Sequence, residues 1–189
     1  MANALTAVRL LLALPLAILL ASKDERAPYA AAAAMVIAIV TDLIDGPVAR
    51  RRRTTGAFGG TFDHATDCVF VVSGLVGGVL RGVFPWLLPV LVVAAFTQYT
   101  VDSYWFHRQG GLHGSRLGRY NGILYFFPLC GDTLVRLGLA FLRPAVAALC
   151  WVLVLSTCIS IGERFMLARQ ARQTDRASRA EGTADRSRR

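Results

Sequence analysis

The organisation of this chain follows from residues 29–67, which read YAAAAAMVIAIVTDLIDGPVARRRRTTGAFGGTFDHATD. The apolar run 29–48 is long enough to cross a bilayer and has two aspartates near its end. A basic loop, residues 50–55, follows, and two further aspartates lie at the start of the next apolar run. This order predicts two apolar helices joined by a short basic turn, with acidic residues at the joined ends.

Similar apolar runs extend on both sides of this stretch. Hydrophobic residues make up 54% of the 189 positions and the mean hydropathy is +0.47, which is more apolar surface than a soluble domain of this size can bury. We therefore expect an all-α integral membrane protein with six transmembrane helices. The expected spans are residues 5–21, 29–48, 61–80, 84–106, 120–142 and 144–167.

Basic residues are distributed unevenly over the expected loops. Fifteen arginines lie on the side of the C-terminal tail, against five basic residues on the other side. The positive-inside rule then predicts a multi-pass protein of the cell membrane, with both termini and the acidic ends of the second and third helices in the cytoplasm. We expect a membrane domain over residues 1–167 and a flexible basic tail over 168–189. Because the arginines adjoin apolar runs, the net charge of +9 indicates contact with membrane lipids and not with nucleic acid.

Four aspartates occur near the joined ends of the second and third expected helices. Asp42 and Asp45 are three residues apart, and Asp63 and Asp67 are four apart, so each pair shares one helical face. The connecting loop is short, which predicts adjacent, antiparallel helices with four carboxylates at similar depth. Such carboxylates would repel one another unless cations bind between them. Their hard oxygen ligands suit Mg²⁺ or Mn²⁺, and two such ions would clamp a diphosphate.

Small residues and an arginine surround these carboxylates in the sequence. Gly46 and Ala49 leave room for a substrate close to the backbone, and Arg50 offers a planar set of donors to a phosphate or a cytosine edge. Gly56, with glycines at 59 and 60, allows a tight entry into the third helix. These residues would complete the site that the four carboxylates begin.

The complete pattern resembles the signature of the CDP-alcohol phosphotransferase (CDP-alcohol phosphatidyltransferase) family. The eight matching positions are Asp42, Asp45, Gly46, Ala49, Arg50, Gly59, Asp63 and Asp67. The opening of the chain, with Asn3, Thr6 and Arg9 before a proline, also resembles the start of that family.

This resemblance implies a metal-dependent enzyme of phospholipid biosynthesis. It would transfer a phosphatidyl group from CDP-diacylglycerol to an alcohol acceptor and release CMP, and the resemblance also implies a homodimer. Asp67 would be the general base and a further metal contact. The other implied residues are the metal ligands Asp42, Asp45 and Asp63, and the donor-binding residues Thr6, Gly46, Ala49, Arg50 and Gly56.

The signature does not identify the acceptor alcohol, because its residues bind the CDP part of the donor, which is common to the whole family. Glycerol 3-phosphate, inositol phosphate, serine and phosphatidylglycerol are all compatible. Arg108, Arg116 and Arg119 follow the fourth run on the catalytic side, and the first interpretation is that they are ordinary loop charges. The alternative is that some of them bind the acceptor's phosphate, which favours a phosphorylated polyol such as glycerol 3-phosphate or inositol phosphate.

Two other functions compete with this interpretation. Aspartates within apolar runs also occur in transporters and in ion or proton relays, but transport gives no reason for Gly46, Ala49 and Arg50 at fixed spacing. Intramembrane prenyltransferases also bind diphosphates through acidic motifs and Mg²⁺, but they are longer and carry two such motifs.

Two further patterns predict packing. Asp132 and Arg136 are four residues apart in the fifth run, which predicts an intrahelical ion pair. Gly74 and Gly78 form a pair of small residues in the third run, which predicts a close helix contact within the subunit.

Overall fold

The computed structural model describes the backbone of residues 2–52, 57–106 and 121–186, and the side chains of residues 7–41, 65–101, 121–167 and 169. Helices and their connecting turns account for all of these residues, and none of them lies in a strand. The predicted all-α class is therefore confirmed.

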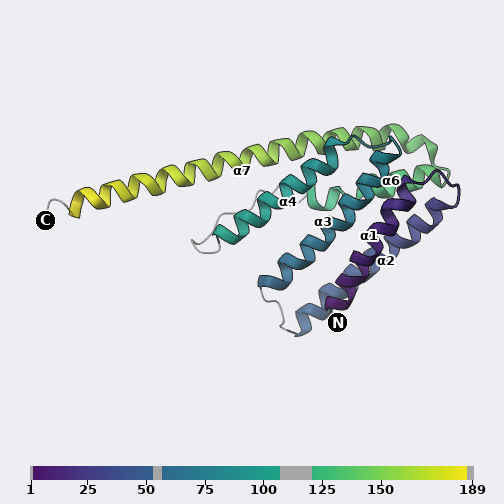
Figure 1. Ribbon diagram of the computed structural model, residues 1–189, viewed down its shortest axis with the longest axis horizontal. Helices are drawn as coiled ribbons and strands as arrows, with labels where there is room; N and C mark the ends of the chain where they lie inside the picture. The colour runs from purple at the N-terminus through teal and green to yellow at the C-terminus, as the bar shows by residue number, and fades with distance from the viewer. Residues whose placement is uncertain (1, 53–56, 107–120, 187–189) are drawn as a thin grey trace.

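Five of the six expected runs each coincide with one long helix (Figure 1). These five helices are α1 (Ala2–Ala21), α2 (Ala27–Arg52), α3 (Ala57–Leu80), α4 (Leu87–Phe106) and α7 (Arg143–Arg186). The fifth expected run, 120–142, is not one continuous helix. It contains a helical turn at 121–124, then α6 (Phe127–Arg136) and the short 3-10 helix η1 (Ala140–Leu142).

Local chemistry explains the break in the fifth run. Pro128 lacks a backbone N–H and stands in the first turn of α6, where that N–H would have no intrahelical acceptor. At the other end Gly138 has a φ of 116°, a left-handed conformation that favours glycine. The N–H of Leu139 then donates to the carbonyl of Leu134 at 3.0 Å, which closes a Schellman motif and ends the helix.

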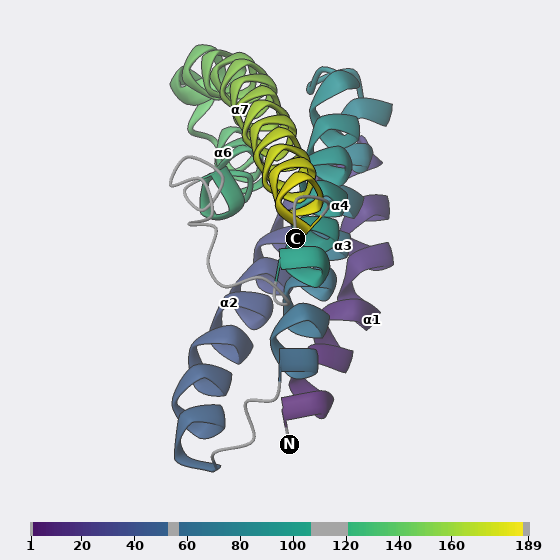
Figure 2. The ribbon, with the colours of Figure 1, turned by 90° about the vertical axis from the view of Figure 1, so that its left-hand side faces the viewer.

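The first helix is the main packing partner of both α2 and α3 within the described residues. α1 packs against both α2 and α3, whereas α2 and α3 make few contacts with each other within the described residues. The two helices run in opposite directions, as expected (Figures 1 and 2). The predicted contact between their joined ends involves side chains outside the described residues and stays a prediction. Gly77 explains the preference of α3 for α1, because a Cβ there would lie 2.3 Å from the carbonyl oxygen of Ala17.

Glycines in α3 allow close packing within the chain. A Cβ at Gly74 would lie 2.9 Å from Leu129 and 3.2 Å from Leu16, and one at Gly78 would lie 2.2 Å from the ring of Phe84. The prediction that Gly74 and Gly78 serve contacts inside the subunit is confirmed. Around them lies a continuous apolar core, whose fully buried members include Leu16, Leu20, Phe70, Leu75, Leu88 and Leu129.

Asp132 has a different partner from the expected one. Its carboxylate pairs with the guanidinium of Arg81 at the end of α3. Arg136 instead donates to backbone carbonyls where α1 ends, those of Leu19 at 3.1 Å, Ser22 at 2.9 Å and Asp24 at 3.1 Å. The predicted intrahelical ion pair is therefore wrong. Helix ends from distant parts of the sequence meet here, and Arg136 binds carbonyls at the end of α1 while Asp132 binds Arg81.

The last helix is 44 residues long and extends well beyond the other helices (Figure 1). It crosses the expected boundary at residue 167 without a break, so the basic segment is a continuation of α7 as far as Arg186. Within the described residues, the stretch Ala140–Leu167 alone is both long and apolar enough to cross a membrane. Four shorter apolar helical stretches accompany it: Ala7–Ala21, Ala27–Thr41, Ala65–Leu80 and Leu87–Val101.

Candidate active site

The signature residues gather at one end of the bundle. The C-terminal end of α2 and the N-terminal end of α3 lie at the same end as the N-terminus of α1, which we call the signature end (Figure 1). The helical backbone places Asp42 and Asp45 on one face of α2, and Asp63 and Asp67 on one face of α3.

Several predicted site residues lie outside the described part of the structure. The backbone is helical but the side chain is not described for Thr6, Asp42, Asp45, Gly46, Ala49, Arg50 and Asp63. Gly56, Arg108, Arg116 and Arg119 lie wholly outside the described residues. Among the side chains that are described, no three potential ligands form a metal cluster. The metal site and the two substrate sites therefore stay predictions.

Asp67 is the signature carboxylate whose surroundings the structure describes. Its side chain forms an ion pair with the guanidinium of Arg9 from α1. The Arg9 side chain is 3% exposed, whereas that of Asp67 is 45% exposed. Arg9 thus reaches the carboxylate from inside the bundle and leaves its outer side open. This contact restrains Asp67 and balances its negative charge.

Sequence reasoning assigned Arg9 no function of its own. A single arginine within an apolar run is a signal, because a buried guanidinium needs an acceptor. The sequence could not name the acceptor, since 58 positions separate Arg9 from Asp67. The close α1–α3 packing at Gly77 brings the two helices together.

Buried polar side chains also connect residues 121–125 to α7. The Asn121 side-chain oxygen accepts a hydrogen bond from Ser156 at 2.8 Å, and the Tyr125 hydroxyl lies 2.7 Å from that of Thr157. One residue further on, Phe126 stacks on Phe70 of α3 with ring centroids 6.0 Å apart. These contacts anchor the end of the segment that carries the three candidate acceptor-binding arginines.

The helix that precedes that segment, α4, also contacts α7. Gln98 of α4 donates to the carbonyl of Ile161 at 3.4 Å, and the guanidinium of Arg164 lies 5.4 Å from the centre of the Tyr99 ring. Both flanks of residues 107–120 are therefore attached to the same helix.

A search of known protein families supports the interpretation of the signature. The profile described as CDP-alcohol phosphatidyltransferase matches residues 1–159, which is most of the chain and includes all four aspartates. The chain belongs to the CDP-alcohol phosphatidyltransferase family. It is therefore a transferase of substituted phosphate groups that moves a phosphatidyl group from a CDP-alcohol to an alcohol acceptor. No match was found among curated proteins or among solved structures.

The family assignment fits the exposed surface of this phosphatidyltransferase. Large apolar side chains are exposed on every long helix, including Leu11 and Leu14 on α1, Val36 on α2, Val90 on α4 and Trp151 on α7. Water would be a poor solvent for such a surface, and lipid a good one. Membrane association, which the family implies, therefore agrees with the outer faces of the bundle.

Proposed function

We propose that this phosphatidyltransferase transfers a phosphatidyl group from CDP-diacylglycerol to the hydroxyl of a phosphorylated polyol and releases CMP. The observation that carries this proposal is the meeting of both halves of the signature at one end of the bundle (Figure 1). It agrees with a family match that covers the same helices. A homodimer, which the resemblance implies, is part of the same proposal.

Two divalent cations, Mg²⁺ or Mn²⁺, fit the chemistry of the signature residues. Carboxylates are hard oxygen donors, and Asp42, Asp45 and Asp63 would hold the ions with help from Asp67. Bound there, the ions would supply positive charge to the diphosphate and to CMP as it leaves.

Asp67 is the proposed general base. Its partly exposed carboxylate takes the proton of the acceptor hydroxyl while Arg9 holds its inner side. The acceptor oxygen then bonds to the lipid-side phosphorus, and the bond from this phosphorus to the bridging oxygen breaks. That oxygen and its electron pair leave with CMP, so the charges and atoms balance.

The donor and acceptor occupy different parts of the proposed site. Thr6, Gly46, Ala49, Arg50 and Gly56 line the CDP half, where small residues admit the nucleotide and Arg50 binds it. The arginines at 108, 116 and 119 bind the phosphate of the acceptor, which favours glycerol 3-phosphate or inositol phosphate.

The proposed topology is six membrane crossings with both termini in the cytoplasm. The helices α1 to α4 contain 20 to 26 residues, which corresponds to about 30 to 39 Å of helix and matches the thickness of a bilayer core. The helical turn at 121–124 together with α6 would form the fifth crossing, and the first part of α7 the sixth.

An acceptor screen with purified full-length protein tests this function. CDP-diacylglycerol would be mixed with glycerol 3-phosphate, inositol phosphate, serine or phosphatidylglycerol, with Mg²⁺ or Mn²⁺ present, and the lipid products identified by mass. We expect one phosphorylated polyol to give a new phospholipid and equimolar CMP, and a chelator to stop the reaction. Full turnover in metal-free buffer would contradict the metal site, and product with serine alone would contradict the polyol. Release of pyrophosphate from a prenyl donor, or ion flux without CMP, would favour the alternative functions.

A further inference from the structure

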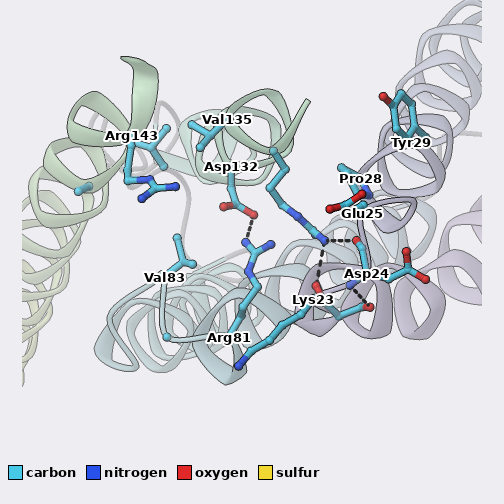
Figure 3. A pocket seen from close by; sticks show the side chains of 15 residues that line it. Lys23, Asp24, Glu25, Pro28, Tyr29, Arg81, Val83, Asp132, Val135 and Arg143 are labelled. Carbon is cyan, nitrogen blue, oxygen red and sulfur yellow. Dashed lines mark hydrogen bonds and ion pairs between the residues drawn. The ribbon is translucent and has the colours of Figure 1, made fainter. Parts of the chain in front are cut away.

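A second charged site lies at the end of the bundle away from the signature. A pocket of about 860 Å³ opens there between the α1–α2 turn, the α3–α4 turn, α6 and the first turn of α7 (Figure 3). Its volume is within the range of about 300 to 1,000 Å³ that small-molecule sites occupy. No residue of the signature lines it, so the proposed phosphatidyl transfer makes no use of this pocket.

Some of the charged residues that line the pocket stabilise the fold. The pocket is lined by four basic residues, Lys23, Arg81, Arg136 and Arg143, and three acidic ones, Asp24, Glu25 and Asp132. The Arg81 side chain is 10% exposed and that of Asp132 is 4% exposed, and the two form an ion pair. Arg136 is bonded to the carbonyls at the end of α1. These charges join three helix ends and have their partners within the protein.

The remaining two cations have no such partner. In the described part of the chain, no hydrogen bond or ion pair engages the ammonium of Lys23 or the guanidinium of Arg143. Figure 3 shows the guanidinium groups of Arg143 and Arg81 directed into the same space. Arg143 also begins α7, and the N-terminal end of a helix carries partial positive charge. An anion in this space would therefore meet the available guanidinium of Arg143 and the positive end of α7, while Lys23 lines another part of the pocket.

Aromatic side chains place the pocket at a membrane surface. Tyr29, which lines it, is exposed at the start of α2, as are Trp86 just before α4 and Phe141 in η1. All three belong to the turns and helix starts at this end of the bundle. Amphipathic aromatic residues, above all Trp and Tyr, concentrate at the level of lipid headgroups. The anion best placed to reach the pocket is therefore one that is already in that layer.

We propose that this pocket binds the phosphate of an anionic phospholipid headgroup, in the leaflet opposite to that of the signature end. Arg143 contacts the phosphate oxygens, Lys23 adds positive charge from another part of the pocket lining, and the acyl chains lie along the exposed apolar faces of the neighbouring helices. Four basic residues against three acidic ones leave one surplus positive charge, which favours an anionic over a zwitterionic lipid. Inorganic phosphate offers the same oxygens without the chains, so the test must separate the two sources.

The test measures lipid binding by the full chain in detergent. Native mass spectrometry would follow titrations with phosphatidylglycerol and phosphatidylcholine, and with inorganic phosphate as a competitor. The variants are Arg143→Gln and Lys23→Gln, with Arg26→Gln as a matched control, because Arg26 is exposed nearby but does not line the pocket. We expect phosphatidylglycerol to bind more tightly than phosphatidylcholine. Each pocket variant should weaken phosphatidylglycerol binding about fivefold, and the control should leave it unchanged.

Three results would overturn the proposal. If both pocket variants bind phosphatidylglycerol as tightly as the control variant does, the lipid binds elsewhere, for instance at the signature end. Equal affinity for the two lipids would contradict an anionic headgroup. Glycerophosphoglycerol is the same headgroup without acyl chains. If it binds as tightly as the lipid, or if equimolar phosphate displaces the lipid, the pocket is a site for a free anion. Lys23→Gln keeps the test valid if Arg143→Gln does not fold, since Lys23 lies in an exposed turn.

Discussion

The contact between Arg9 and Asp67 connects the apolar interior of the bundle to its signature end. Arg9 is buried and Asp67 is half-exposed, so the carboxylate has one side held by the protein and one side open to a substrate. A base needs this combination, because proton transfer depends on a fixed oxygen within hydrogen-bond reach of the acceptor.

The first prediction separates Asp67 from the other signature carboxylates. Asp67→Asn retains size and one oxygen but cannot accept the acceptor's proton, so turnover should fall by about 10² to 10⁴. Binding of CDP-diacylglycerol should persist. Asp42→Asn and Asp63→Asn should instead weaken metal and donor binding together. Binding and turnover of all three variants in one detergent provide the measurement. Loss of donor binding in Asp67→Asn as severe as in the other two would reject the role of base.

The second prediction concerns Arg9 as a positioning residue. Arg9→Gln removes the cation that holds Asp67, so we expect kcat to fall at least tenfold while KM for the donor changes little. Because Arg9 contacts Asp67, the loss from Arg9→Gln should be smaller in an Asp67→Asn background than in the native protein. Additive losses in this double-mutant cycle would show that Arg9 acts on the substrate or on the fold.

At the scale of elements, two contacts determine how the helices meet. Gly77 allows the backbones of α1 and α3 to touch, and the ion pair of Arg81 with Asp132 joins the end of α3 to α6. Both contacts connect segments that are far apart in the sequence. Substitutions at Gly77 are opposed by a steric clash, and substitutions in the Arg81–Asp132 pair by the cost of an unpaired buried charge.

The third prediction tests the steric contact. A methyl group at Gly77 would lie 2.3 Å from the carbonyl oxygen of Ala17, which is backbone and cannot rotate away. Gly77→Ala should therefore destabilise the bundle by about 1 to 3 kcal/mol. Gly162→Ala is the matched control, because a Cβ there meets nothing within 4 Å and should stabilise α7 by roughly 0.5 to 1 kcal/mol. Thermal unfolding in detergent measures both, and a stable Gly77→Ala would disprove the close contact.

The fourth prediction tests the ion pair. Asp132→Leu leaves the guanidinium of Arg81 buried without its carboxylate, which should cost about 3 kcal/mol or more. The double variant Arg81→Leu with Asp132→Leu removes both charges and should recover most of that loss. Thermal midpoints of the single and double variants decide between the outcomes. A double variant less stable than Asp132→Leu would mean that Arg81 has a separate structural function.

At the scale of the whole molecule, the exposed apolar faces and the long α7 determine how the protein lies in a membrane. The outer faces of α1, α2, α4 and α7 are apolar, and α7 extends beyond the bundle toward the C-terminus (Figure 1). In the proposed topology, the signature end and the pocket at the other end face opposite leaflets, so the proposed substrate site and the proposed lipid site lie on opposite sides of the membrane.

The fifth prediction is the topology itself. Single cysteines would be introduced at Arg51, Lys23 and Arg186 in a cysteine-free background, and labelled in intact cells with a thiol reagent that does not cross membranes. The distribution of arginines places Arg51 and Arg186 in the cytoplasm, so only Lys23→Cys should react. Labelling of Arg51→Cys in intact cells would contradict a cytoplasmic active site, and different labelling of Arg51→Cys and Arg186→Cys would contradict six crossings.

The sequence alone determined the helical class, the approximate positions of five long helices and the family. Each of these depends on neighbours along the chain: apolar runs form helices, spacings of three and four place the aspartates of a pair on one face, and fixed positions make the signature recognisable. Even the break in the fifth run is local in origin, since Pro128 and Gly138 cause it.

Only the tertiary structure decided which distant groups meet. It paired Arg9 with Asp67 and Asp132 with Arg81, and made α1 the helix that packs against both α2 and α3. It also assembled the pocket from four segments that share no motif. The physical reason is that a buried charge is stabilised by any suitable partner within a few ångströms, and helix packing, not sequence spacing, determines which partner comes within that distance.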